Sequence, residues 1–293
     1  MTKAIPVAEG FQYSFRAMGS PCDIRIDCDD GELATRVGEI AELEAFRIEY
    51  KYSRYRQDSY LSKLNATAGD AIMVDEETAA LLEYAAHCYE ISDGMFDITS
   101  GVLRQLWQFD RTDRIPEMAS IRKLLPFIGW HKVAWNDSVL NLPKGMEIDL
   151  GGLGKEYAVD SAILKVKALT SAPVLINFGG DLRVTGPRAN GKRWRIALDC
   201  VDANGGTEGM FELASGALTT SGDAERFLEK DGVRYSHILN ARTGWPVKHP
   251  PRSVTVAART CMEAGVLSTL AMLKGRNAEA FLKREAIQSW VIR

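Results

Sequence analysis

Residues 149–160 read Asp-Leu-Gly-Gly-Leu-Gly-Lys-Glu-Tyr-Ala-Val-Asp and contain three glycines within four positions. Glycine has no Cβ, so such a turn lets the backbone approach a ligand or a neighbouring segment closely. Residues 146–149 before it predict a short strand, and residues 157–166 after it have apolar positions at helical spacing. A glycine turn that opens a helix can aim backbone N–H groups at an anion. We therefore predict an anion-binding turn, with Asp149 and Lys155 beside the ligand.

The turn matches neither of the two common phosphate-binding motifs. A P-loop has glycine where this chain has Asp149, and serine or threonine where it has Glu156. A dinucleotide fingerprint that started at Gly152 would need a third glycine at the position of Tyr157. Two interpretations stay open at this point, an anion cradle of another kind and a purely structural turn.

The composition is that of an ordinary globular protein, with 293 residues, 46% hydrophobic and 26% charged content, and a formal net charge of -3. This charge gives no reason to expect nucleic-acid binding. No apolar run approaches the roughly 18 residues of a membrane span. The five cysteines show neither disulfide nor zinc spacing and favour reduced thiols. The first residues lack the apolar core of a signal peptide, so we expect a cytoplasmic protein, or a periplasmic one if a leader was removed.

Helical periodicity dominates the first half of the chain, and strand-like runs dominate the second. Helices are predicted over 32–50, 75–92, 99–109 and 261–274. Strands are predicted over 11–27, with an interruption at 17–21, and over 132–135, 139–142, 174–178, 193–199, 209–213 and 253–257. This order favours an α+β fold, with helices packed on a mostly antiparallel sheet, over a doubly wound one. We expect one domain over residues 1–293, with a helix-rich part at about 30–125 and a strand-rich part at about 126–293.

Several further segments carry polar and aromatic residues in short, recognisable groups. They are Met-Gly-Ser at 18–20, Tyr-Ser-Arg-Tyr-Arg-Gln-Asp-Ser at 52–59, Asp-Gly-Met-Phe-Asp-Ile-Thr at 93–99, Asn-Phe-Gly-Gly-Asp at 177–181, Thr-Ser-Gly-Asp at 220–223 and Ser-His-Ile-Leu-Asn-Ala-Arg-Thr-Gly-Trp-Pro at 236–246. No single group is specific. In this order, together with the glycine turn, they resemble the ApbE family of FAD:protein FMN transferases from about residue 15 to about residue 275.

The resemblance implies an α+β fold that holds FAD in a cleft between the two parts of the chain. It implies cleavage of FAD at the diphosphate, transfer of FMN to a Thr or Ser hydroxyl of an acceptor protein, and release of AMP. Magnesium assists this reaction in the family. Two alternatives stay open: an FAD-binding relative without transferase activity that serves as a carrier or assembly factor, and an FAD pyrophosphatase that gives FMN and AMP.

The resemblance also assigns roles to individual residues. His237 is the candidate general base, because an imidazole accepts a hydroxyl proton near neutral pH; a buried structural histidine is its alternative. Tyr55 and Phe96 could instead be core aromatics. Asp97 could be a helix or turn cap, and Asp181, which follows a glycine, could merely close a turn. The residues expected to contact FAD are Met18, Tyr55, Phe96, Asp97, Asp149, Lys155, Asp181 and Ile238.

One departure from the family pattern concerns the metal. The family binds magnesium with an Asp and, four residues later, a Thr on a late helix, and with a backbone carbonyl that corresponds to Gly152 here. In this chain Thr269 is present, but Gly265 replaces the aspartate. Glu263 should point elsewhere, about 200° around the helix, which leaves Asp149, Asp181 and Asp223 as possible replacements. Glu156, at a position that is commonly glycine in the family, is a second and lesser departure. The resemblance thus implies a weakened or rearranged magnesium site, and an expected gain in metal affinity for Gly265→Asp.

Overall fold

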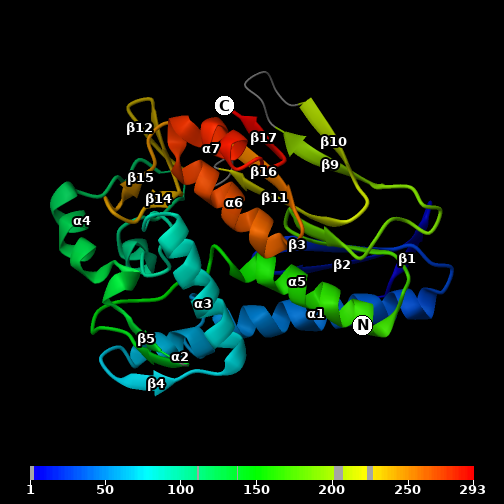
Figure 1. The fold of residues 1–293 in the computed structure, drawn as a ribbon, viewed down its shortest axis with the longest axis horizontal. Helices are drawn as coiled ribbons and strands as arrows, with labels where there is room; N and C mark the ends of the chain where they lie inside the picture. Colours follow the sequence, from blue (N-terminus) through cyan, green and yellow to red (C-terminus); the bar gives the residue numbers. More distant parts are fainter. Residues whose placement is uncertain (1–2, 111, 137, 201–206, 223–226) are drawn as a thin grey trace.

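The computed structural model describes residues 3–110, 112–136, 138–200, 207–222 and 227–293. Its centre is an eight-stranded sheet in which every pair of neighbouring strands is antiparallel (Figure 1). In sheet order the strands are β1 (Ile5–Val7), β2 (Gly10–Ala17), β3 (Ser20–Ile26), β7 (Val174–Phe178), β8 (Asp181–Val184), β11 (Gly216–Gly222), β16 (Ser253–Ala258) and β17 (Ser289–Ile292). The predicted α+β fold with a mostly antiparallel sheet is confirmed.

Different layers cover the two faces of this sheet. Helices α1 (Gly31–Tyr52), α5 (Gly154–Leu169) and α6 (Cys261–Leu273) pack on one face, and α7 (Ala278–Arg284) packs beside α6 (Figure 1). The strand pair β9 (Trp194–Cys200) and β10 (Thr207–Leu213) covers part of the other face. Successive side chains of a strand point to opposite faces. Accordingly, Ile176 lies in the helix-covered core, whereas its neighbour Leu175 packs against Trp194.

The remaining elements lie to one side of the large sheet, on the left in Figure 1. They are α2 (Tyr60–Ala66), α3 (Glu76–Ile91) and α4 (Met118–Leu124), a small sheet of β4 (Ala71–Met73), β5 (Ala134–Asn136) and β6 (Val139–Asn141), and the pairs β12 (Phe227–Lys230) with β13 (Val233–Ser236) and β14 (Leu239–Asn240) with β15 (Trp245–Pro246). A second apolar cluster forms around Trp107, whose indole N–H donates to the Gly244 carbonyl at 2.8 Å. Residues from both halves of the sequence therefore build this side of the molecule.

Two of the predicted elements are wrong. The strand over 146–149 is reduced to a single bridge between Glu147 and Ser100, because the chain then enters the glycine turn. The helix over 99–109 is reduced to one 3-10 turn, Gly101–Gln105. After that turn, Trp107 stacks on Phe109 and contacts other segments, and these tertiary contacts override the apolar periodicity. The first three strands also join the sheet built from the second half of the chain.

The residues that α1 buries are not all apolar, and those that it exposes are not all polar. Leu43 and Phe46 are 69% and 43% exposed, whereas Glu44 is buried. The Glu44 carboxylate accepts hydrogen bonds from Arg47 at 2.7 Å and from Ser161 of α5 at 2.5 Å. Polar contacts between α1 and α5 therefore determine which side of α1 is buried.

Glu77 of α3 contacts both α1 and α5, and it should make the free energy of unfolding depend on pH in the acidic range. Its carboxylate accepts from Lys51 of α1 at 2.7 Å and from Tyr157 of α5 at 2.8 Å, and it is paired with Arg47. The Arg47 guanidinium in particular lowers the pKa of Glu77 from 4.5 to about 2. A lowered folded-state pKa stabilises the protein above the unfolded value, and this contribution is lost as the pH falls from about 4.5 towards 2.

We expect Glu77→Gln to lower the free energy of unfolding at pH 7 by about 2 kcal/mol, after allowance for solvent screening. The difference from the parent should shrink as the pH falls through this window, as measured by urea denaturation at several pH values. Glu76→Gln, at the exposed neighbouring position, is the control. If the free energy of unfolding of the parent and of Glu77→Gln changed equally with pH, the lowered pKa of Glu77 would not be the source of the acid dependence.

Candidate functional site

Two tight turns lie side by side at one end of the large sheet. Met18 and Gly19 connect β2 to β3, and Gly179 and Gly180 connect β7 to β8; all four residues have positive φ angles, between 51° and 97°. Such angles are typical of two-residue hairpin turns. Because β3 pairs with β7, the Gly179 N–H donates to the Pro21 carbonyl at 3.0 Å. The predicted Met18 and the Gly-Gly-Asp motif therefore share one end of the sheet.

The glycine turn at 150–153 leads into α5, which begins at Gly154. No side chain of the described residues caps this helix, so its first N–H groups are left to the backbone turn or to a ligand. The ring of Phe96 lies over Gly152: a Cβ on this glycine would sit 3.6 Å from the ring. The turn thus has a helix N-terminus on one side and a buried aromatic ring on another.

Arg54, which the sequence prediction missed, connects two of the predicted FAD contacts. Its guanidinium donates to the Asp149 carboxylate, and to the Tyr55 hydroxyl at 2.8 Å. Asp149 also accepts from the Gly151 N–H at 2.9 Å, which holds the start of the turn. The Tyr55 side chain is 77% exposed, so it is not a core aromatic. The Arg-Tyr-Arg group at 54–56 was the signal that could have identified Arg54.

Lys155 and Asp181 form an ion pair on the other side of the turn. Lys155 Nζ lies 2.7 Å from Asp181 Oδ2, which links the first turn of α5 to the first residue of β8. Asp181 is buried, and burial raises the pKa of its carboxyl group while the Lys155 charge lowers it. The structure therefore brings together Lys155 and Asp181, two of the residues expected to contact FAD.

Glu156, the next residue of α5, points towards α6. It is only 8% exposed, and a Cβ built on Gly265 would lie 2.5 Å from Glu156 Cγ and 2.8 Å from its Oε1. Within the described part of the chain, Glu156 Oε2 has no hydrogen-bond partner. Burial, reinforced by the nearby Asp181, raises the pKa of Glu156 to about 8. A buried carboxyl group in this state is typical of functional sites.

The face of α6 that carries Gly265 is lined with hydroxyl groups. Ser268 donates to the Gly265 carbonyl at 2.9 Å, and Ser221 of β11 lies 2.8 Å from Ser268 and 3.2 Å from Thr269. The start of α6 is fixed to α5, because Asp160 accepts from the N–H groups of residues 261 and 262, each at 3.0 Å. Asp223 lies outside the described residues.

His237 and Ile238 lie between β13 and β14. The His237 ring is half-buried and makes an edge contact with Phe109, at 6.2 Å between ring centroids. Ile238 packs against both the main core and the cluster around α6. Its N–H donates to Ser236 at 3.1 Å, and its carbonyl accepts from Val247 at 3.0 Å. Packing of Ile238 therefore anchors the His237 segment beside α6.

Asp97 has a well-defined set of hydrogen bonds. Its buried carboxylate accepts from the Thr99 N–H at 2.8 Å, from the Thr99 hydroxyl at 2.6 Å and from the Trp130 N–H at 3.1 Å. Burial raises its pKa, and these hydrogen bonds lower it. Asp97 also lines a pocket of about 550 Å³ with His131 and Arg242. This geometry favours a structural role in the 93–99 loop, while contact with FAD remains a prediction.

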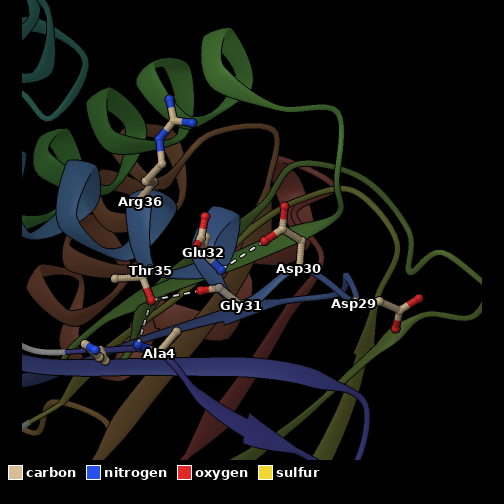
Figure 2. A pocket seen from close by; sticks show the side chains of 8 residues that line it. Ala4, Asp29, Asp30, Gly31, Glu32, Thr35 and Arg36 are labelled. Atoms are coloured by element: carbon tan, nitrogen blue, oxygen red, sulfur yellow. Dashed lines mark hydrogen bonds between the residues drawn. The ribbon is translucent and has the colours of Figure 1, made fainter.

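A second pocket, of about 790 Å³, lies elsewhere, at the start of α1 (Figure 2). Its lining includes the acidic residues Asp29, Asp30 and Glu32. Asp30 caps α1 by accepting from the N–H groups of residues 32 and 33. The lining also includes Lys3 and Arg36, so the pocket has three acidic and two basic side chains and offers a diphosphate no net positive charge.

Comparison with known proteins shows the family of this chain. The model of the ApbE family matches residues 18–291. A relative from Vibrio cholerae named FAD:protein FMN transferase is 31% identical over 281 residues, which cover 92% of this chain and 82% of the relative. A relative of the same name from Haemophilus influenzae is 28% identical over 271 residues, covering 87% and 78%.

Solved structures match over almost the full chain. An ApbE protein from Thermotoga maritima gives a TM-score of 0.85 at 30% identity, covering 96% of this chain and 93% of that protein. The flavinyl transferase ApbE from Pseudomonas stutzeri gives a TM-score of 0.86 at 27% identity, covering 100% and 92%. The order of motifs, the fold and these matches agree, and the chain belongs to the ApbE family.

Proposed function

We propose that this protein is an FAD:protein FMN transferase. The observation that carries the proposal is the glycine turn at the end of the sheet, with the Lys155–Asp181 pair on one side and the Arg54–Asp149 pair on the other. Relatives with this function name are about 30% identical over most of the chain. The arrangement suits a substrate with a diphosphate in its middle.

We place FAD between the helix-rich and strand-rich parts. The diphosphate lies at the uncapped start of α5, where N–H groups and the positive end of the helix dipole favour an anion. Phe96 and the exposed Tyr55 offer aromatic surfaces to the flavin or adenine ring. Met18 and Ile238 supply apolar contacts at the edges.

The reaction is an attack by an acceptor hydroxyl on the diphosphate. The Thr or Ser oxygen forms a bond to the phosphorus of the FMN half, and the bond from that phosphorus to the bridging oxygen breaks. AMP leaves with the bridging oxygen, and His237 takes the proton of the hydroxyl. Lys155 and Arg54 counter the negative charge of the diphosphate from the two sides of the turn.

The residues present also fit a magnesium ion. Glu156 has a buried oxygen without a partner in the described chain, and it lies beside a glycine and near hydroxyl groups. Hard oxygen donors of this kind are those that magnesium prefers. Thr269, the Gly152 carbonyl and a carboxylate would hold the ion. When bound, magnesium would neutralise charge on the phosphate oxygens.

The partner implied by this function is a protein with a Thr or Ser flavinylation site. Among the described residues, the helices are all too short or too polar to cross a bilayer.

The expected result of incubation with FAD, Mg²⁺ and a flavin-acceptor protein is covalent labelling of the acceptor and release of AMP. In-gel flavin fluorescence detects the label, and chromatography detects AMP. An acceptor with its Thr replaced by Val is the control. AMP without labelling would indicate the pyrophosphatase alternative, and tight FAD binding without either product would indicate the non-enzymatic one. Either result would overturn the transferase proposal.

A further inference from the structure

We propose that Glu156 supplies, from α5, the metal-binding carboxylate that this chain lacks at position 265 of α6. The inference rests on the proposed function, because the ion it serves is the one that neutralises the FAD diphosphate. The two departures from the family pattern, Glu156 and Gly265, are then related: the carboxylate that is missing from α6 is present on the neighbouring helix α5.

Glu156 fills the space beside Gly265. A Cβ on Gly265 would lie 2.5 Å from Glu156 Cγ, 2.8 Å from Oε1 and 3.0 Å from Cδ, which are distances that real Cβ atoms essentially never show. The carboxyl group of Glu156 therefore occupies the space into which a side chain at 265 would project. The carboxyl carbon of an aspartate is only one bond beyond its Cβ. An aspartate at 265 and a glutamate at 156 would thus place their carboxylates in nearly the same volume.

Glu156 differs from its acidic neighbours in its partners. The acidic neighbours of Glu156 already have partners: Asp181 pairs with Lys155, and Asp160 pairs with Arg183 at 2.7 Å. Glu156 Oε2 has no hydrogen bond in the described part of the chain, and Glu156 is only 8% exposed, so water has little access to it. A buried carboxylate is unfavourable without a cation or hydrogen bonds. A bound cation would supply the missing partner.

The remaining ligands would come from oxygen groups of α6 and of the glycine turn. Thr269 lies four residues after Gly265, and residues at this spacing share a face of a helix. Gly152 lies four residues before Glu156, directly before α5 begins. One carboxylate, one hydroxyl and one carbonyl, completed by phosphate oxygens and water, match the usual environment of Mg²⁺.

If Glu156 is the ligand, Gly265→Asp alone should not raise metal affinity, unlike the expectation from the sequence. With Glu156 in its present conformation, an added side chain at 265 would have to displace the Glu156 side chain inside a buried space. We expect this single variant to be less stable than the parent. The two positions must change together.

The test uses Glu156→Gln, Glu156→Gly and the double variant Glu156→Gly/Gly265→Asp. Mg²⁺ affinity is measured by titration calorimetry on protein saturated with FAD, and Mn²⁺ affinity by the loss of the free-ion EPR signal. FAD affinity is measured without metal from flavin fluorescence, and thermal melting reports folding. Glu156→Gln keeps the shape of the side chain and replaces its carboxyl group with a neutral amide, which cannot supply an anionic ligand.

We expect both single variants at 156 to lose at least about tenfold in metal affinity, since even residues that only orient a ligand cost 10–100-fold. FAD affinity without metal should stay within about threefold. The double variant should recover most of the metal affinity, because it returns the carboxylate to α6. Wild-type metal affinity in Glu156→Gln, or no recovery in a folded double variant, would overturn the inference.

These readouts separate the two proposals. If wild-type protein binds Mg²⁺ through Glu156 but labels no acceptor, the proposed function fails and the ligand assignment stands. If the wild type labels an acceptor and Glu156→Gln binds Mg²⁺ normally, the proposed function stands and the assignment of Glu156 as a metal ligand fails.

Discussion

His237→Ala should reduce FMN transfer by about 10²–10⁴-fold, the usual contribution of a general base. FAD binding should stay close to that of the parent, because we place His237 at the acceptor hydroxyl and not at the diphosphate. Initial rates of acceptor labelling at saturating FAD measure the first quantity, and flavin fluorescence measures the second. Transfer by the parent should also fall at acidic pH, where a protonated imidazole cannot accept a proton.

The control for this prediction is His87→Ala, at an exposed position on α3, which should leave transfer unchanged. Thermal melting of His237→Ala separates catalysis from folding. The ring of His237 contacts Phe109, so a purely structural histidine would lower the melting temperature and FAD affinity together. That outcome would favour the structural alternative and remove His237 from the reaction.

Lys155→Met should lower the free energy of unfolding by about 3 kcal/mol at neutral pH and weaken FAD binding as well. The change removes the partner of Asp181, whose side chain is only 6% exposed, and an uncompensated buried charge costs about 3–5 kcal/mol. The lower end applies because the Lys155 side chain is 35% exposed. Urea denaturation and flavin fluorescence measure the two effects.

The double variant Lys155→Met/Asp181→Asn identifies the cause. Without either charge, most of the stability should return, whereas FAD binding should stay weak because the positive charge is still missing. The stability loss of Lys155→Met should also shrink at low pH. Burial raises the pKa of Asp181 above its unfolded value, so Asp181 stays protonated in the folded protein to a higher pH than in the unfolded chain. The stability loss of Lys155→Met should therefore be small at low pH and grow as Asp181 ionises in the folded protein. A loss that is independent of pH would contradict an electrostatic cause.

Prediction from the sequence succeeded where a signal is local. The interruption at 17–21 became the Met18–Gly19 turn between β2 and β3. The periodicity of 75–92 and 261–274 became α3 and α6 within one or two residues. It failed where distant contacts dominate, as in the 99–109 segment, whose Trp107 is held by the Gly244 carbonyl.

The candidate site divides in the same way. The glycine turn, Lys155 and Asp181 follow from motifs, and their proximity agrees with the resemblance. Arg54 was overlooked because its partner Asp149 is far away in the sequence. Glu156 was treated as a lesser departure because, within α5, nothing indicates which helix its side chain faces.

The sequence by itself determined the family of this protein, the position of its glycine turn and the absence of a carboxylate at residue 265. These are properties of residue order, and they can be read without knowing how helices pack. Only the tertiary structure decided that the carboxylate of Glu156 fills the space beside Gly265. The physical reason is that α5 and α6 pack side by side on one face of the sheet, so a side chain on one helix can occupy the volume that a residue on the other leaves open.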